Sequence, residues 1–81
     1  MLNRPSYVQY EGRLLVELVQ KELITTFKKN KHEAQEMIKK VGIYDAVIES
    51  PRRLHDSPHK WALIVLTQYN DVEAIEQYFL N

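Results

Sequence analysis

The densest group of reactive side chains in this sequence is the segment 55–59, His-Asp-Ser-Pro-His, which holds two imidazoles and a carboxylate within five residues. A zinc or iron site needs three or four such ligands, with the imidazoles oriented by further acceptors. A loop that leads into a helix explains the same residues, since Asp56 or Ser57 suits a helix cap. We therefore interpret His55, Asp56 and His59 as structural, and we predict no metal and no cofactor.

The other polar candidates for chemistry are weaker. The segment 32–36, His-Glu-Ala-Gln-Glu, has one imidazole where the helical zinc-protease motif needs two, and we interpret it as a solvated helix face. Ser57 is the only nominal nucleophile beside a histidine, and no glycine-rich turn follows that would supply an oxyanion hole or a phosphate cradle. We accordingly predict that the protein is not an enzyme.

Length and composition narrow the remaining classes of protein to which the chain can belong. The chain has 81 residues, eleven basic and eleven acidic side chains, and no cysteine. A domain this small buries a limited core, and without disulfides or thiolate metal sites oligomerisation is the expected supplement. The sequence shows neither a signal-peptide pattern nor an apolar run of about 20 residues that would span a bilayer. We expect a cytoplasmic homodimer without membrane association.

The elements that position these residues are predicted to be helices, because two glycines and three prolines are too few turn residues for a sandwich or barrel. The predicted fold is all-α, one helical domain over residues 1–81, a compact bundle. It has four main helices at about 7–28, 31–41, 58–69 and 71–80 and a short helix at about 44–50.

Capping signals set most of these boundaries. Three pairs have the spacing of a capping box: Ser6 with Gln9, Asn30 with Glu33, and Asn70 with Glu73. Gly42 suits the left-handed residue that ends a helix, with Ile43 folding back onto Ile38. Pro51 ends the short helix, and Ser57 followed by Pro58 starts the next one.

Two apolar patterns define the expected core. The run 61–66, Trp-Ala-Leu-Ile-Val-Leu, predicts a central helix, while a strand over 60–69 is the alternative that periodicity alone leaves open. The first helix carries a broad stripe of apolar side chains that drifts around its axis, interrupted by Gly12, where we expect another backbone to pass close. This stripe consists of Val8, Leu14, Leu15, Leu18, Val19, Leu23 and Phe27.

The leading functional prediction is a protein-interaction module, a regulator or adaptor that acts through helix faces on a protein partner. Aromatic side chains are enriched at binding hot spots, and the chain has eight of them. If the first and last helices pack together, Tyr7 and Tyr10 meet Tyr69, Tyr78 and Phe79 in a single patch, and the alternative is that these side chains close the core. The candidate partner-binding site consists of Tyr7, Tyr10, Tyr78 and Phe79.

The alternative prediction is nucleic-acid binding. A helix over 31–41, a turn at Gly42 and a short helix after it resemble a divergent helix-turn-helix, although Pro51 cuts the would-be recognition helix short. Asp45 and Glu49 on that helix would face phosphates unfavourably. The candidate phosphate contacts are Lys28, Lys29, Lys31, Lys39, Lys40, Arg52 and Arg53.

Overall fold

The computed structural model of the chain describes residues 4–80, all of whose regular elements are helical. They are α1 (Arg4–Thr25), α2 (Lys31–Val41), α3 (Ile43–Glu49), the 3-10 helix η1 (Pro51–His55), α4 (Pro58–Gln68) and α5 (Val72–Leu80). The predicted all-α fold is confirmed, and η1 is the element that sequence reasoning missed. The strand alternative for 60–69 is wrong, because α4 occupies that segment.

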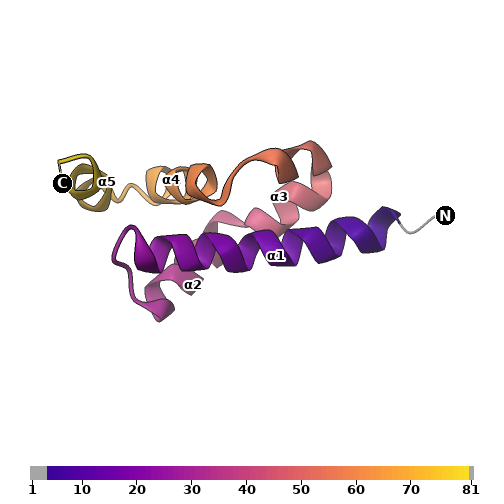
Figure 1. The fold of residues 1–81 in the computed structure, drawn as a ribbon, viewed down its shortest axis with the longest axis horizontal. Coiled ribbons are helices and arrows are strands. Elements are labelled where there is room, and N and C mark those ends of the chain that lie inside the picture. The colour runs from indigo at the N-terminus through magenta and orange to yellow at the C-terminus, as the bar shows by residue number, and fades with distance from the viewer. Residues whose placement is uncertain (1–3, 81) are drawn as a thin grey trace.

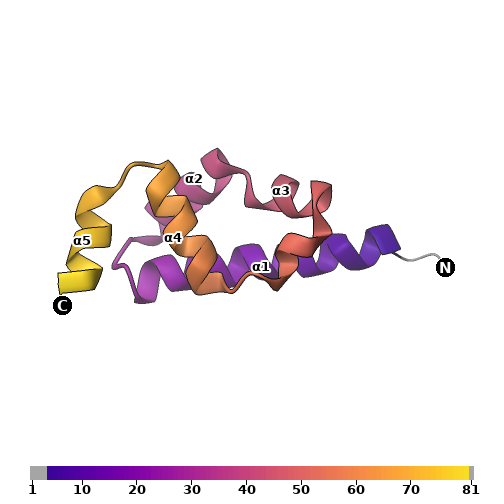
Figure 2. The same ribbon diagram turned by 90° about the horizontal axis from the view of Figure 1, so that it is seen from above.

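The helices form an elongated molecule with principal extents of 47 × 21 × 18 Å. Helix α1 runs along most of its length, and α2, α3, η1 and α4 pack against it (Figure 1). Seen from above, α4 crosses over α1, and α2 and α3 follow each other along the molecule (Figure 2). Helix α5 packs mainly on α4, near the end of the molecule opposite the amino terminus.

Local capping explains why α2 has the predicted bounds. The Asn30 side chain accepts from the Glu33 backbone N–H at 2.7 Å, and the Glu33 carboxylate accepts from the Asn30 N–H at 3.2 Å, so the capping box is complete. At the other end Gly42 has φ 76° and donates its N–H to Ile38 O at 2.9 Å. A residue without a Cβ adopts this left-handed conformation without strain.

The predicted start of α4 is also confirmed, since the Ser57 hydroxyl accepts from the Lys60 N–H at 3.1 Å and Pro58 is the first helical residue. The predicted cap at Asn70 is wrong. Asn70 adopts φ 62° and closes α4, while Asp71 donates its N–H to Leu66 O and caps α5 by accepting from the Ala74 N–H at 3.2 Å. A left-handed residue after α4 cannot also be the extended cap of the next helix.

The first helix is displaced from its prediction. It begins at Arg4, so Ser6 lies inside the helix rather than at its start, and the side chain of Ser6 lies outside the described residues. It ends at Thr25, and Lys28, with φ 61°, reverses the chain while the Lys29 N–H donates to Leu23 O. The predicted helix, which ends near residue 28, therefore includes the turn that follows α1.

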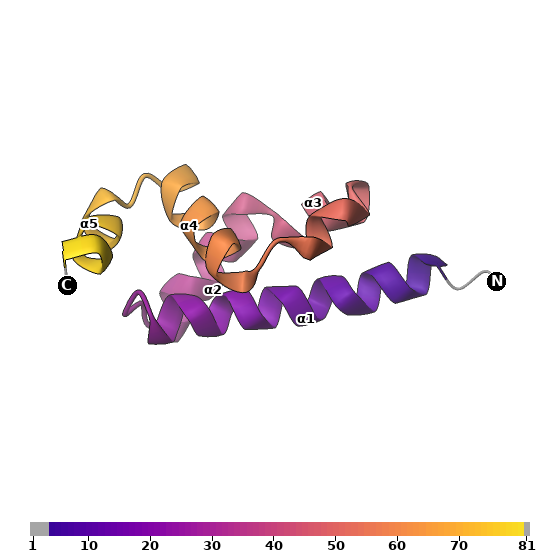
Figure 3. The same cartoon turned by 45° about the horizontal axis from the view of Figure 1, so that its top comes forward.

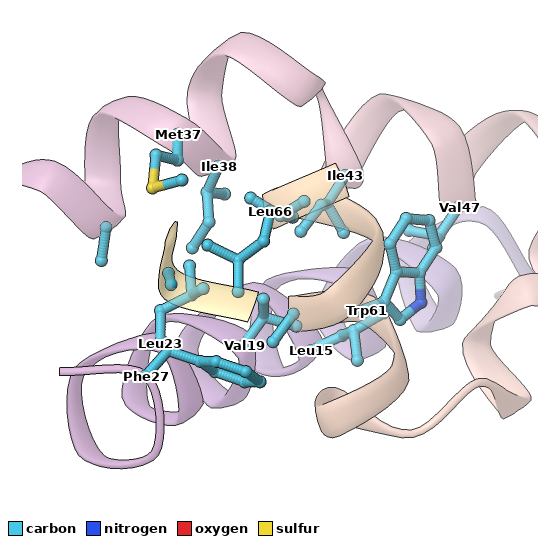
Figure 4. Close-up of a cluster of buried hydrophobic side chains, with 14 residues drawn as sticks. Leu15, Val19, Leu23, Phe27, Met37, Ile38, Ile43, Val47, Trp61 and Leu66 are labelled. Atoms are coloured by element: carbon cyan, nitrogen blue, oxygen red, sulfur yellow. The ribbon is translucent and has the colours of Figure 1, made fainter. Parts of the chain in front are cut away.

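A single hydrophobic core joins α1 to α4. The cluster contains Val19 and Leu23 of α1, Ile43 and Val47 of α3, and side chains of α4. Trp61 lies beside Val47, and Leu66 lies near Ile43 (Figure 4). Six of the fully buried side chains are Leu23, Ile43, Leu66, Val19, Val47 and Val65, and Trp61 is 1% exposed. Within 61–66 only Leu63 and Ile64 keep partial exposure, so one chain covers its central helix by itself.

Two expectations concern the packing of α1. Gly12 is a point of close approach to α3, and the atoms nearest to a Cβ added there belong to side chains. A Cβ there would lie 3.2 Å from Val47 Cγ2 and 3.3 Å from the Tyr44 ring. Leu14 and Leu18, expected in the core, are 39% and 49% exposed. Leu15 and its neighbours one turn apart already face the other helices, and both sides of one helix cannot turn to the same core.

Candidate interaction surface on helix α1

The outer face of α1 carries an exposed apolar stripe made of Tyr7, Tyr10, Leu14 and Leu18. At about 100° per residue, the spacing of three, four and four residues keeps these side chains within roughly 80° of arc around the helix. The two tyrosines are each 60% exposed. All the other helices lie on one side of α1 (Figure 3), and Leu14 and Leu18 are 39% and 49% exposed.

The opposite face of α1 packs into the core and so fixes the position of the stripe. Leu15, Val19 and Leu23 are buried in the core, roughly 140° around the helix from the stripe. Because Gly12 has no side chain, α3 approaches α1 closely at that position. Helix α1 packs against both α3 and α4. The stripe is therefore a pre-formed surface on a rigid element.

Charged side chains border this stripe. Arg13 and Glu17, both exposed and four residues apart, lie on one edge and line a shallow groove of about 380 Å³ with Val16 and Tyr44. On the other edge Glu11 and Tyr7 of the stripe itself line a cleft of about 600 Å³ between the start of α1 and η1. An apolar centre between charged edges is the usual anatomy of a helix that packs on a partner.

The other two candidate residues lie elsewhere. Tyr78 packs on Phe27 with ring centroids 5.0 Å apart, and Phe79 packs on Tyr78 at 5.1 Å. Helix α5 and the start of α1 lie toward opposite ends of the molecule (Figure 1), so the single patch expected from the four aromatic residues does not form. Phe79 remains 67% exposed, while Tyr78 helps to close the end of the core.

The histidines and acids of the segment 55–59 do not converge on a metal site. His59 Nδ1 lies 2.7 Å from a Glu22 carboxylate oxygen, and its ring packs on Phe27 and Tyr78. Asp56 accepts from the Lys60 ammonium at 3.3 Å. Among the described residues, no group of three His, Cys, Asp or Glu side chains is placed to hold a metal ion.

The basic residues of the nucleic-acid alternative are dispersed. Those of the α1–α2 turn and those of η1 lie toward opposite ends of the molecule (Figure 1). Lys29 pairs with Asp71, and the Arg53 guanidinium lies 4.4 Å from the Trp61 ring centroid. The helix α3, after the turn at Gly42, buries Ile43 and Val47 and exposes Asp45 and Glu49.

Among the described residues, Asp71 has a pKa that departs clearly from its ordinary value. Partial burial works to raise the pKa of Asp71, but the hydrogen bond from Lys29, the Ala74 N–H and the Lys29 charge outweigh it and hold that pKa below its ordinary value. This pair joins the turn after α1 to the start of α5.

Comparisons with protein-family models, with curated proteins and with solved structures found no significant match to this chain. None of the described helices has the length and apolarity needed to cross a membrane.

Sequence reasoning identified Tyr7 and Tyr10 as surface candidates but assigned Leu14 and Leu18 to the core. The signal that distinguishes them is their spacing, since residues 7, 10, 14 and 18 form one narrow row. The buried residues 15, 19 and 23 form a second row on another side of the helix.

Proposed function

We propose that this protein is a non-enzymatic interaction module, a regulator or adaptor, that binds protein through the outer face of α1, and that a second copy of the chain is one of its partners. The observation that carries this proposal is the exposed row Tyr7, Tyr10, Leu14 and Leu18. Aromatic and aliphatic side chains gathered on one rigid face, with charges at its edges, are typical of a contact surface.

The self-association we expect is weak. Helix α1 has 22 residues and is therefore about 33 Å long. One pair of helices in contact over this length buries less than the roughly 800 Å² per partner of a standard stable interface. We expect a dissociation constant on the order of 1–100 μM.

Sedimentation velocity over roughly 0.5–500 μM tests the proposal by bracketing that range. The wild-type chain is expected to shift from monomer to dimer, and Leu14→Lys with Leu18→Lys is expected to remain monomeric with unchanged helical circular dichroism. The matched control is Ile48→Lys, an exposed apolar residue on α3 outside the row. A wild-type chain that stays monomeric throughout, or equal loss of dimer in the control, would contradict the proposal.

The nucleic-acid alternative stays a prediction that no contact in the structure favours. Salt-dependent binding of random duplex DNA, lost when Lys39, Lys40, Arg52 and Arg53 are replaced by glutamate, would support it in place of the interaction module.

A further inference from the structure

We propose that two copies of this chain pair through antiparallel α1 helices, with the two-fold axis at the level of residue 15, so that Arg13 of each copy forms an ion pair with the partner's Glu17. This inference rests on the proposed function, since it specifies the geometry of the self-association. Arg13 and Glu17 are both exposed on the same edge of the apolar row.

Symmetry gives this pairing its charge complementarity. When two helices pack antiparallel about a two-fold axis, each edge of the interface meets the same edge of the other copy. An arginine and a glutamate four residues apart on one edge then face each other reciprocally. One contact surface thus forms two identical ion pairs, Arg13 with the partner's Glu17 and Glu17 with the partner's Arg13.

The parallel arrangement lacks this complementarity. In a parallel pair the edge that carries Glu17 meets the opposite edge of the other copy, about five residues further along. That position is Glu22, so two carboxylates would face each other. Glu22 already accepts a hydrogen bond from His59.

The same register also places the apolar side chains of the row together. Leu14 lies between the partner's Leu14 and the partner's Leu18, because positions that sum to about 30 are opposite each other. Tyr10 lies beside the partner's Leu18 and the partner's Lys21, whose ammonium suits the face of a tyrosine ring. The other helices of each copy stay on the outer sides, since they all lie on one side of α1 (Figure 3).

Charge reversal tests the interchain pairs directly. Arg13→Glu and Glu17→Arg each convert both attractive pairs into repulsive ones, and each variant alone should self-associate about tenfold more weakly than the wild-type chain. An equimolar mixture of the two variants restores both interchain pairs, while the like charges within each chain remain. We expect the mixture to dimerise with near wild-type affinity, as measured by sedimentation velocity.

Cysteine cross-linking tests the direction of the helices, because the chain contains no natural cysteine. In the antiparallel pair, position 10 lies within about two residues of the partner's position 18, whereas the two copies of position 10 are about 15 Å apart along the axis. A disulfide needs Cα atoms within about 7 Å. A mixture of Tyr10→Cys and Leu18→Cys should therefore form mixed disulfides, and neither variant alone should cross-link.

The outcomes separate the two proposals. A wild-type chain that never dimerises overturns this inference together with the proposed self-association. A dimer that depends on Leu14 and Leu18, yet fails to re-form from mixed charge variants and cross-links each cysteine variant to itself, overturns only the antiparallel geometry. Re-formation of the mixed dimer with mixed disulfides supports it.

Discussion

His59, in the first turn of α4, donates from Nδ1 to the Glu22 carboxylate of α1 across a separation of 37 residues in the chain, with a distance of 2.7 Å. Both side chains are partly buried, and the imidazole also packs against Phe27 and Tyr78. This contact fixes the start of α4 on α1 beside the aromatic residues that close the end of the core. It gives a structural role to one member of the polar segment 55–59.

A double-mutant cycle on this pair should show coupling. Glu22→Gln and His59→Gln each weaken the hydrogen bond, and the expected coupling free energy is about 1 kcal/mol, typical of a partly buried bond with a charged acceptor. Urea unfolding of the four proteins at pH 7 measures it. Additive effects would show that the contact contributes nothing to stability, and His55→Gln, an exposed histidine in η1, serves as the unaffected control.

Two residues in the left-handed conformation predict changes in stability of opposite sign. Gly42 has φ 76°, and apart from its chain neighbours no heavy atom lies within 4 Å of a Cβ added there, so Gly42→Ala should destabilise the fold by about 1 kcal/mol through backbone strain alone. Lys28 is a non-glycine residue with φ 61°, and Lys28→Gly should stabilise by roughly 0.5 kcal/mol. Thermal unfolding of both variants checks the opposite signs, and a destabilising Lys28→Gly would show that its side chain matters more than its backbone.

The sequence predictions are accurate where the residues that decide a feature lie close together in the chain. The Asn30–Glu33 capping box and the Ser57–Pro58 helix start each depend on residues within four positions, and the structure places them as predicted. Asn70 and Asp71 show the limit of this reasoning. Both have cap-forming side chains, and the choice between them depends on the left-handed closure of α4.

Packing between distant segments explains the remaining errors. Helix α1 has two apolar rows, and periodicity does not tell which one the other helices cover, so Leu14 and Leu18 were assigned to the core. The contact between His59 and Glu22 joins residues 37 positions apart, and no spacing rule connects them. The aromatic residues at the two ends of the chain meet only if the first and last helices pack together, but α5 lies toward the opposite end of the molecule from the start of α1 (Figure 1).

The Asp71–Lys29 pair predicts acid sensitivity. Because the folded-state pKa of Asp71 is lowered, its contribution is present above the unfolded value of about 3.9 and is lost as the pH falls through the folded pKa. Asp71→Asn keeps a capping side chain but removes the charge, and should cost roughly 1 kcal/mol at pH 7. Urea unfolding at pH 7, 5 and 3 should show this difference disappear only below about pH 4.

The control for this pH dependence is Glu73→Gln, which removes an exposed carboxylate from the same first turn of α5. It should change stability by only a few tenths of a kcal/mol at any of these pH values. A difference between wild type and Asp71→Asn that persists unchanged at pH 3 would contradict the role of the charge.

A final prediction concerns the apolar run of α4. The more deeply a residue is buried, the more its replacement by aspartate should destabilise the fold. Val65 is fully buried, and Val65→Asp places an unpaired carboxylate in the core, so we expect the chain to be unfolded at pH 7. Leu63, two residues earlier, is only partly buried at the edge of the core, and Leu63→Asp should leave a folded but destabilised protein because the carboxylate can reach water.

The fluorescence of Trp61, the only tryptophan, distinguishes these two variants. Its indole is 1% exposed in the folded chain and donates to Arg53 O at 3.3 Å, so its emission should be blue-shifted in the wild type and in Leu63→Asp. In Val65→Asp the emission should resemble that of the wild type in urea. A folded Val65→Asp would mean that α4 is not covered by the other helices of its own chain.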